Sequence, residues 1–298
     1  MYIITGASGN TGKLIAQQLI NAGKPVTVVG RTPDPLKVFT DQGVRAAIGQ
    51  LEDVDFLTET FRGARAVYAM IPPSFVTTDF PSYQNRIADA LTSAIRANRV
   101  PYAVSLSSFG AHLANHNGMI QGMSRLENQL NAIDWLNVLH LRAGFFFSNF
   151  FNNIGFLKQA GLLGGFPISR NVPLAMVHPN DIADAAARYL LALDFTGKTV
   201  QFVAGPRDLT LDEAARILGR SIGKPDLNWT TFSYDEAREG LLQAGLQPSL
   251  VENYIEYSQR ANDGSLSEGF VRNAGNTTPT TLETFAEQEF APAYRAAV

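Results

Sequence analysis

The stretch Gly6-Ala7-Ser8-Gly9-Asn10-Thr11-Gly12 decides the fold of this chain. It follows an apolar stretch at residues 2–5, which we interpret as a strand, and it precedes a helical pattern that ends at Ala22-Gly23. A strand, a glycine-rich turn and a helix in this order are typical of a dinucleotide site, because the free N–H groups and the dipole of the helix N-terminus attract phosphate. The apolar stretch 26–29 then closes a βαβ unit of the expected length. The sequence therefore predicts a dinucleotide-binding domain.

The three glycines of this loop have separate roles. Gly6 can adopt a backbone conformation closed to other residues, Gly9 leaves the path of a pyrophosphate free of side chain, and Gly12 lets the helix pack closely on the strand. The spacing G-x-x-G-x-x-G departs from the standard G-x-G-x-x-G and is typical of short-chain dehydrogenase/reductase chains. A P-loop is the competing phosphate site, but Ala7 stands in place of its first glycine and Leu14 replaces the Ser/Thr that would hold magnesium.

The end of the second strand bears on the choice of nicotinamide cofactor. An acidic residue there would bind the ribose hydroxyls and repel a 2′-phosphate, whereas this chain has Gly30-Arg31. A guanidinium can pair with a 2′-phosphate through two hydrogen bonds and can stack on adenine. A solvated arginine at a strand end is the alternative interpretation. We predict NADPH as the favoured cofactor, with NADH possible.

Strands and helices alternate in the first half of the chain. We expect further strands at 44–48, 66–71, 102–107 and 138–141, and helices near 36–41, 53–62, 82–98 and 119–133. Continuous apolar strands alternating with amphipathic helices predict an α/β fold with a Rossmann-type, doubly wound parallel sheet covered on both faces. Ligands of such sheets bind at the carboxyl ends of the strands, so the loops after the strands should hold the site.

The second half predicts a smaller, mostly helical C-terminal lobe. Three capping boxes, Thr210-x-x-Glu213, Ser233-x-x-Glu236 and Thr280-x-x-Glu283, place helix starts at or near each. We divide the chain into an NAD(P)-binding domain at 1–150 and a substrate or acceptor lobe at 151–298. The helix 180–193 and the strand 199–203 are expected to return to the first domain.

Composition and charge exclude several classes of protein. A formal net charge of −3 without a basic run gives no footprint for nucleic acid or for an anionic membrane. The absence of cysteine excludes disulfides and thiolate chemistry. A strand that begins at residue 2 leaves no room for a signal peptide. We expect a cytoplasmic enzyme, a monomer or homodimer, with no nucleic-acid partner and no membrane association.

Several motifs together resemble the NmrA-like group of atypical short-chain dehydrogenases/reductases. They are the glycine-rich loop, Leu141-Arg142-Ala143-Gly144-Phe145 with Asn149, Val177-His178-Pro179-Asn180-Asp181-Ile182-Ala183, and Leu209-Thr210-Leu211-Asp212-Glu213 running into Ile222-Gly223-Lys224. The resemblance covers essentially the whole chain and is strongest to NAD(P)H:quinone oxidoreductases and triphenylmethane dye reductases. Other members of the group are regulators that bind the dinucleotide without turnover. The resemblance implies a Rossmann domain, a small C-terminal lobe and an acceptor site between them.

The resemblance also implies roles for individual residues. The loop residues Gly6, Ser8, Gly9, Asn10, Thr11 and Gly12 would hold the pyrophosphate, and Arg31 the 2′-phosphate. Gln50 and Leu51 would flank the adenine, and Ile71 and Pro72 would run beside the ribose and nicotinamide. Phe145 and Asn149 fall where the group lines its acceptor pocket. Ser107 ends the fifth strand, where short-chain reductases place a substrate-orienting hydroxyl, although a turn-forming serine is an equal alternative.

The chain lacks the proton relay of ordinary short-chain reductases. None of its nine tyrosines has a lysine four residues later, so no Tyr-x-x-x-Lys pair can protonate an alkoxide. Some NmrA-like relatives carry a lysine or histidine four residues before the glutamate that matches Glu127, where this chain has Met123. A thioether cannot serve as a general acid. Carbonyl reduction by the usual route is therefore not expected.

An aromatic block follows the strand that ends at Arg142, with phenylalanines at 145, 146, 147, 150 and 151. Flat conjugated acceptors stack on such rings, and Phe145 and Phe147 are our main pocket candidates, although aromatic residues at such spacing are usually core. The weaker candidates lie on loops: Phe75, Phe109 and Phe166. His178 could reach the cleft, but a structural turn is the alternative role.

The other histidines carry little chemistry. His112 and His116 lack a third metal ligand, so we expect no metal, and His140 fits a hydrogen-bonded core position. We predict an NADPH-dependent oxidoreductase that transfers hydride to a quinone or similar conjugated acceptor without a Tyr-Lys relay; its catalytic residues are not identifiable from sequence. A non-catalytic NADP(H)-binding redox sensor is the main alternative. A carbonyl or ene reductase that uses Ser107 or water as proton source is a third.

Overall fold

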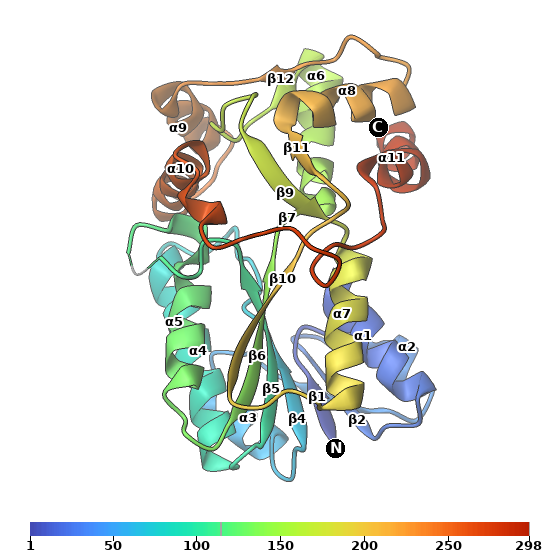
Figure 1. Ribbon diagram of the computed structural model, residues 1–298, viewed down its shortest axis with the longest axis vertical. Coiled ribbons are helices and arrows are strands. Elements are labelled where there is room, and N and C mark those ends of the chain that lie inside the picture. The colour runs from blue at the N-terminus through green and yellow to red at the C-terminus, as the bar shows by residue number, and fades with distance from the viewer. Residues whose placement is uncertain (114, 298) are drawn as a thin grey trace.

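The computed structural model describes residues 1–113 and 115–297. Its main sheet has seven strands in the order β10-β6-β5-β4-β1-β2-β3, and every neighbouring pair is parallel. This confirms the predicted Rossmann-type sheet, which fills the lower half of Figure 1. The strands are β1 (Tyr2–Ile4), β2 (Val26–Gly30), β3 (Arg45–Ile48), β4 (Ala66–Ala69), β5 (Tyr102–Ser108), β6 (Asn137–Ala143) and β10 (Lys198–Val203).

Helices cover both faces of this sheet, as Figure 1 shows. One face carries α1 (Asn10–Asn21), α2 (Lys37–Thr40) and α7 (Pro179–Ala192), and the other carries α3 (Val54–Thr60), α4 (Phe80–Ala97) and α5 (Gln121–Asn131). A 3₁₀ turn, η1 (Asp34–Leu36), precedes α2, and another, η2 (Gly118–Ile120), precedes α5. The late elements α7 and β10 belong to this part of the molecule, because α7 packs on α1 and β10 pairs with β6.

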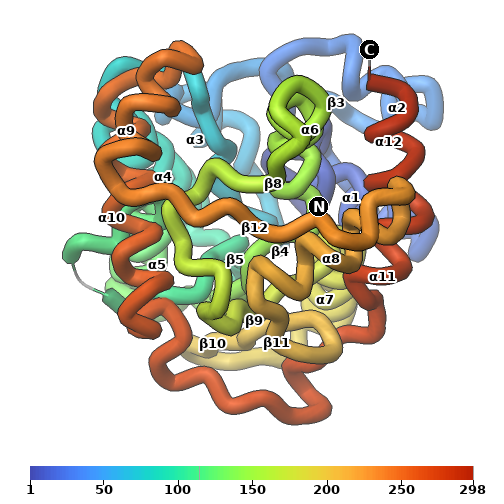
Figure 2. The backbone as a smooth tube through the Cα atoms, turned by 90° about the horizontal axis from the view of Figure 1, so that it is seen from above, coloured from blue at the N-terminus to red at the C-terminus, as the bar shows by residue number. Residues whose placement is uncertain are grey.

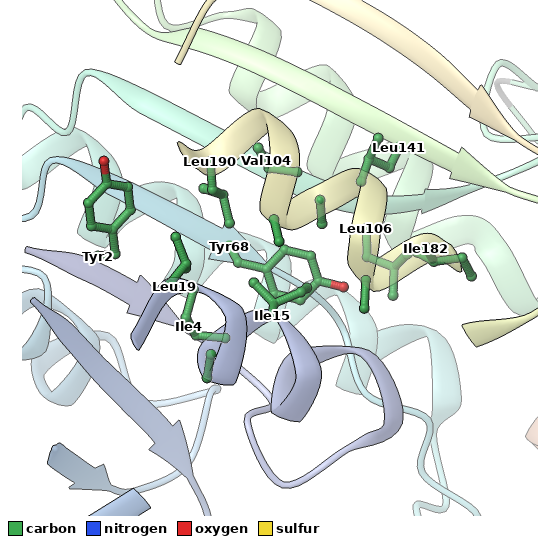
Figure 3. Close-up of a cluster of buried hydrophobic side chains, with 14 of the residues drawn as sticks. Tyr2, Ile4, Ile15, Leu19, Tyr68, Val104, Leu106, Leu141, Ile182 and Leu190 are labelled. Carbon is green, nitrogen blue, oxygen red and sulfur yellow. The ribbon is translucent and has the colours of Figure 1, made fainter. Parts of the chain in front are cut away.

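Tyr68 lies at the centre of the core between the sheet, α1 and α7 (Figure 3). Its fully buried ring shares that core with Ile15 of α1 and Leu190 of α7. Burial raises the pKa of its hydroxyl, and a hydrogen bond of 3.0 Å to the Thr11 hydroxyl opposes that rise. This hydrogen bond links the first turn of α1 to β4 in the middle of the sheet.

The smaller lobe combines short strands with helices. Figure 2 views the molecule from the lobe side, with α9 and α10 on one flank, α8, α11 and α12 on the other, and β8 and β12 crossing between them. A three-stranded sheet has the order β11-β9-β7, and β8 pairs with β12. The lobe strands are β7 (Phe145–Phe146), β8 (Leu163–Gly164), β9 (Pro173–Val177), β11 (Asp208–Thr210) and β12 (Trp229–Thr230).

The lobe helices are mostly short. They are α6 (Ile154–Ala160), α8 (Leu211–Ser221), α9 (Tyr234–Gln243), α10 (Pro248–Asn262), α11 (Leu282–Phe285) and α12 (Ala291–Ala296), with the 3₁₀ turns η3 (Phe147–Asn153) and η4 (Ser265–Ser267) and the π turn η5 (Ala286–Phe290). Among the residues that the structure describes, no helix combines the length and apolarity needed to cross a membrane.

Two of the three predicted capping boxes are confirmed and one is wrong. Thr210 with Glu213 caps α8, and Ser233 with Glu236 caps α9, each with both reciprocal hydrogen bonds. At the third position Thr281, not Thr280, caps the helix, and its side chain accepts from the Thr284 N–H. The backbone N–H and hydroxyl of Thr280 both donate instead to the carboxylate of Asp181, at 3.1 and 2.6 Å. This long-range contact outcompetes the local cap.

Candidate functional site

The glycine-rich loop has the geometry that the sequence predicts. Gly6 adopts φ +64°, and a Cβ there would stand 2.7 Å from the Met70 sulfur. A Cβ on Gly12 would collide with the carbonyl oxygen of Gly6, because α1 passes directly over the turn. Gly6 and Gly12 are therefore required by the fold of the loop itself. Gly9 is exposed and forms the N-cap of α1.

The first turn of α1 presents unpaired N–H groups at the carboxyl edge of the sheet. Gly9 provides no side-chain cap, and its carbonyl accepts the first intrahelical bond from the Lys13 N–H. The N–H groups of Asn10, Thr11 and Gly12 precede that bond, so none has a partner within the helix. This is the arrangement that binds phosphate. Thr11 contributes only its backbone N–H, because its hydroxyl is buried against Tyr68.

Arg31 and Gln50 are brought together at the ends of neighbouring strands. Both side chains are exposed, and the Gly49 N–H donates to the Gly30 carbonyl where β2 and β3 end. Arg31 joins no ion pair with any described carboxylate, so its guanidinium is available to a phosphate. Leu51 and Ile71 are almost fully buried, so each has little surface with which to contact a ligand. Pro72 is half-buried. The predicted cofactor contacts of Leu51 and Ile71 would therefore be small in area.

A buried charged cluster lies below the end of β5. The Glu127 carboxylate of α5 accepts two hydrogen bonds from Arg142 of β6, at 3.0 and 2.6 Å, and one of 2.5 Å from the Ser107 hydroxyl. The Glu127 side chain is only 5% exposed. Burial acts to raise the pKa of Glu127, but the hydrogen bonds from Arg142 and Ser107 and the nearby positive charge hold that pKa below its usual value. Glu127 is therefore a carboxylate at neutral pH.

This cluster determines whether the Ser107 hydroxyl can donate or accept a hydrogen bond to a ligand. A hydroxyl has one hydrogen, and that of Ser107 points to Glu127, so only its lone pairs remain for a ligand. Ser107 can accept a hydrogen bond but cannot protonate a product. The structure thus argues against Ser107 as the proton source of a carbonyl or ene reductase.

His140 lies beside this cluster and is a core residue. Its Nδ1 lies 2.6 Å from the Ser105 hydroxyl and its Nε2 lies 2.9 Å from the Asn131 side-chain oxygen. Burial lowers the pKa of His140 to about 4, against a weaker opposing effect from Glu127. The ring is neutral at physiological pH, and both of its nitrogens are occupied. His140 therefore has no free group for catalysis.

A group of packed rings, the apolar wall, links β7 to α10. The rings of Phe145 and Phe166 meet edge to face at 5.8 Å, and Phe166 packs on Tyr254 of α10 at 5.3 Å. Phe166 and Tyr254 remain half-buried, so each keeps accessible surface. Met123 is also half-buried and packs against the same lobe core. Phe145 itself is 8% exposed and belongs to the same buried lobe core, so it has only an edge to offer a ligand, and its role in an acceptor pocket stays a prediction.

Other predicted pocket residues are placed elsewhere. Phe147 is 1% exposed and packs on Phe285 and His178 inside the lobe, which leaves no surface for an acceptor. Phe109 is nearly buried and meets Phe202 and Phe270 edge to face, at 4.9 and 4.8 Å.

Two loop candidates remain accessible. Phe75 is 49% exposed on the loop after β4, and Asn149 is half-buried in η3. Phe75 makes no aromatic contact with the described rings.

His178 has a structural role at the start of α7. Its Nδ1 accepts from the Asn180 N–H as the N-cap, and its Nε2 lies 2.7 Å from the Glu289 carboxylate. With the Thr280 to Asp181 contact, this interaction fastens the C-terminal segment to α7. Both nitrogens are occupied, and the turn interpretation of His178 is the one that the geometry supports.

Sequence reasoning did not single out two groups of side chains that the structure brings together. Glu127 and Arg142 were visible within motifs, but nothing in their spacing showed that they pair or that they hold the hydrogen of Ser107. Tyr254 and Tyr257 gave no signal, because two tyrosines three residues apart on a helix look like core. In the part of the chain that the structure describes, no group of three or more His, Asp or Glu side chains could hold a metal ion.

Comparison with known proteins supports an NAD(P)H-binding domain. A family model described as NAD(P)H-binding matches residues 6–137. A curated relative, the (4-alkanoyl-5-oxo-2,5-dihydrofuran-3-yl)methyl phosphate reductase of Streptomyces griseus, is 27% identical over 268 residues, which are 89% of this chain and 88% of the relative. The dinucleotide-binding domain is therefore supported by sequence as well as by geometry.

Solved structures resemble the whole chain. NADPH-dependent quinone oxidoreductase QOR2 of Escherichia coli, complexed with NADPH, has a TM-score of 0.78 at 20% identity over 97% of this chain and 100% of its own. Triphenylmethane reductase of Citrobacter sp., complexed with NADP(H), also has 0.78 at 20% identity over 97% and 99%. NmrA, a negative transcriptional regulator in complex with NAD, has 0.67 at 16% identity over 99% and 97%. At these identities the likeness establishes the fold.

Proposed function

We propose that this chain, whose fold is that of the NmrA-like atypical short-chain dehydrogenases/reductases, is an NAD(P)H-dependent reductase of quinones or similar conjugated acceptors. The similar reductase from Streptomyces griseus supports a reductase, and QOR2 and triphenylmethane reductase support a flat conjugated acceptor. NADPH is the favoured cofactor, because Arg31 is exposed at the end of β2 and no described carboxylate pairs with it.

One observation carries the choice of acceptor: the hydrogen of Ser107 is directed to the ionised Glu127. We place the acceptor between Ser107 and the wall of Phe145 and Phe166, and none of these side chains can act as an acid toward it. A simple carbonyl needs a proton as it takes hydride, whereas a quinone or a cationic dye takes hydride onto a delocalised system. Orientation on the apolar wall then supplies most of the catalysis.

The site residues have distinct roles in this proposal. The N–H groups of Asn10, Thr11 and Gly12 would bind the pyrophosphate, and Arg31 would bind the 2′-phosphate. When bound, the dinucleotide supplies the hydride. Ser107, as an acceptor only, suits the amide N–H of a nicotinamide or the O–H of a reduced product. The apolar wall excludes water and orients the acceptor.

The test is NADPH oxidation by the purified protein, followed by absorbance across benzoquinones, naphthoquinones and cationic dyes, against protein-free blanks. Asn10→Asp is the matched control, because an exposed aspartate in the first turn of α1 suits the helix dipole but repels phosphate. Saturable oxidation by the wild type that is lost in Asn10→Asp, with unchanged thermal stability, is the expected result. Tight NADPH binding without turnover on any acceptor would contradict the proposal.

A non-catalytic NADP(H)-dependent regulator is the second candidate, and Met123 is the observation that favours it. Met123 offers no proton at a position where some relatives have a lysine or histidine, and the regulator NmrA shares the fold. The same assay separates the two. A regulator would bind NADPH and NADP⁺ with different consequences for a partner protein and would show no turnover.

A further inference from the structure

Two tyrosines of α10 face the apolar wall. Tyr254 and Tyr257 lie on the same side of the helix as the buried residues Leu250 and Ala261, at intervals of three and four residues. The Tyr254 ring packs on Phe166, and Tyr257 packs against the lobe core that contains Phe145 and Ile120. The side of α10 that carries both tyrosines is therefore turned toward the proposed acceptor site.

The hydroxyls of these tyrosines are available to a ligand. Within residues 1–113 and 115–297, neither hydroxyl makes a hydrogen bond, whereas those of Tyr68, Tyr189 and Tyr234 all do. Burial raises the pKa of Tyr254 and of Tyr257 to about 12, and the nearby Tyr254 adds to the rise at Tyr257. Neither oxygen is among the fully enclosed polar atoms without a partner, so both reach accessible space.

We propose that Tyr254 and Tyr257 are catalytic residues that donate hydrogen bonds to the oxygen of a quinone-type acceptor as that oxygen gains negative charge. This inference rests on the proposed function and names the acceptor class that the site favours. Two phenol hydroxyls held by packed rings beside an apolar wall are the kind of donor that stabilises a developing oxyanion.

The electron and proton balance is simple. The dihydronicotinamide gives one hydride, two electrons with one proton, to the quinone, which becomes a hydroquinone anion while the cofactor becomes NADP⁺. The tyrosines hold the anionic oxygen by hydrogen bonds and keep their own protons, because a phenol of pKa about 12 is a weaker acid than a hydroquinone. Water supplies the second proton when the product leaves, and the resulting hydroxide is neutralised by buffer.

A cationic dye provides the contrasting case. A triphenylmethane cation takes hydride onto its central carbon and becomes neutral, so no oxygen gains charge. Hydrogen-bond donors at the wall contribute nothing to that reaction, whereas the rings that bind the flat acceptor contribute to both. Loss of the hydroxyls should therefore affect quinone reduction selectively.

The experiment compares Tyr254→Phe, Tyr257→Phe and the double variant with Tyr189→Phe. Tyr189 is a control on α7 whose hydroxyl donates to Gln201 of β10. Each substitution keeps the ring and its packing. We measure kcat/KM for benzoquinone and for malachite green, a cationic triphenylmethane dye, with Tm and NADPH Kd as controls. The expected result is a loss of about hundredfold to thousandfold with benzoquinone in the double variant, the cost of removing an oxyanion donor, and less than about twofold change with the dye.

The outcomes separate two kinds of failure. Equal losses with both acceptors indicate a packing role and overturn the inference, and so does an unchanged benzoquinone rate in the double variant. If the wild type reduces quinones but not the dye, the dye is replaced by a series of substituted benzoquinones. The loss of kcat/KM in the double variant must then grow with the basicity of the hydroquinone anion that each quinone forms. A wild type that binds NADPH but reduces neither acceptor overturns the proposed function, and this inference with it.

Discussion

Arg142 holds both carboxylate oxygens of Glu127, with its Nε 3.0 Å from one and its Nη2 2.6 Å from the other. The two residues come from different elements, β6 and α5, and the ion pair is buried, with side chains 13% and 5% exposed. A second ion pair on α4 and α5, Arg125 with Asp89, has similar two-bond geometry but lies in solvent, at 44% and 47% exposure. The molecule thus contains its own comparison of a buried and a surface pair.

Arg142→Met should cost about 3–5 kcal/mol of folding free energy, because it leaves the Glu127 carboxylate buried without its partner. Arg125→Met, at the exposed pair, should cost no more than about 1 kcal/mol. Urea unfolding measures both. A second variant, Glu127→Met with Arg142→Leu, should recover much of the loss, since removing both charges leaves none uncompensated. An equal loss of folding free energy in Arg142→Met and Arg125→Met would show that groups other than Arg142 stabilise the Glu127 carboxylate.

Arg31→Asp should weaken NADPH binding by at least about tenfold and leave NADH binding nearly unchanged. The reason is the loss of a guanidinium from the end of β2, where a 2′-phosphate is expected, and the introduction of a like charge. Kd values from NADPH and NADH fluorescence titrations check this. Arg62→Asp, an exposed arginine at the end of α3, is the matched control and should affect neither cofactor. A similar loss for both cofactors would assign Arg31 to the shared part of the dinucleotide.

Gly12→Ala should both destabilise the protein and abolish cofactor binding, because the added methyl collides with the Gly6 carbonyl and pushes α1 off the turn. The control is Gly240→Ala in α9, where nothing lies within 4 Å of the new Cβ. That substitution should stabilise the protein by about 0.4–1 kcal/mol, since alanine is the better helix former. Thermal unfolding and NADPH titration of the two variants provide the comparison. Normal NADPH affinity in Gly12→Ala would mean that the loop can move aside.

His140 should make the protein less stable in mild acid. Its pKa falls from 6.5 to about 4 on folding, so the unfolded chain binds the proton more readily. The contribution is fully present above pH about 6.5 and is lost as pH falls from about 6.5 to 4, amounting to roughly 2 kcal/mol between pH 7 and 5.

His140→Gln should remove that part of the pH dependence while keeping hydrogen bonds to Ser105 and Asn131 within reach. The measurement is the urea midpoint at pH 7 and pH 5 for both proteins. Glu127 does not confuse the result, since its depressed pKa affects stability only below its ordinary value of 4.5. Parallel pH curves for wild type and variant would assign the acid sensitivity to another group.

Turns and helix caps could be predicted from the sequence where residues close together in the chain determine them. The glycine-rich loop needs a positive φ at Gly6 and no side chain at Gly12, and both requirements lie within seven residues. The capping boxes at Thr210 and Ser233 are likewise complete within four residues. The box at Thr280 was wrong because its competitor, Asp181, lies 99 residues away in sequence. A local pattern cannot report a distant carboxylate.

The acceptor site depended on tertiary contacts and was predicted only in part. Phe145 and Phe147 are two residues apart and equally aromatic, yet the first joins the wall with Phe166 and the second turns inward onto Phe285. The choice between them is made by strand β7 pairing with β9, which no periodicity reveals. Tyr254 reaches Phe166 because α10 packs across η2, the 3₁₀ turn ahead of α5. Such returns are set by the packing of the whole lobe.

The return of α7 and β10 to the main sheet determines how this protein could be divided. A fragment that ended at residue 150 would lack the strand beside β6 and the helix that covers Tyr68, so a sheet edge and a row of apolar side chains would meet water. Such a fragment is expected to aggregate. Anyone who wants the dinucleotide module by itself would need to rejoin residues 178–203 to the first half through a short linker that replaces the lobe. The lobe is thus built from an insertion before α7 and from the segment that follows β10.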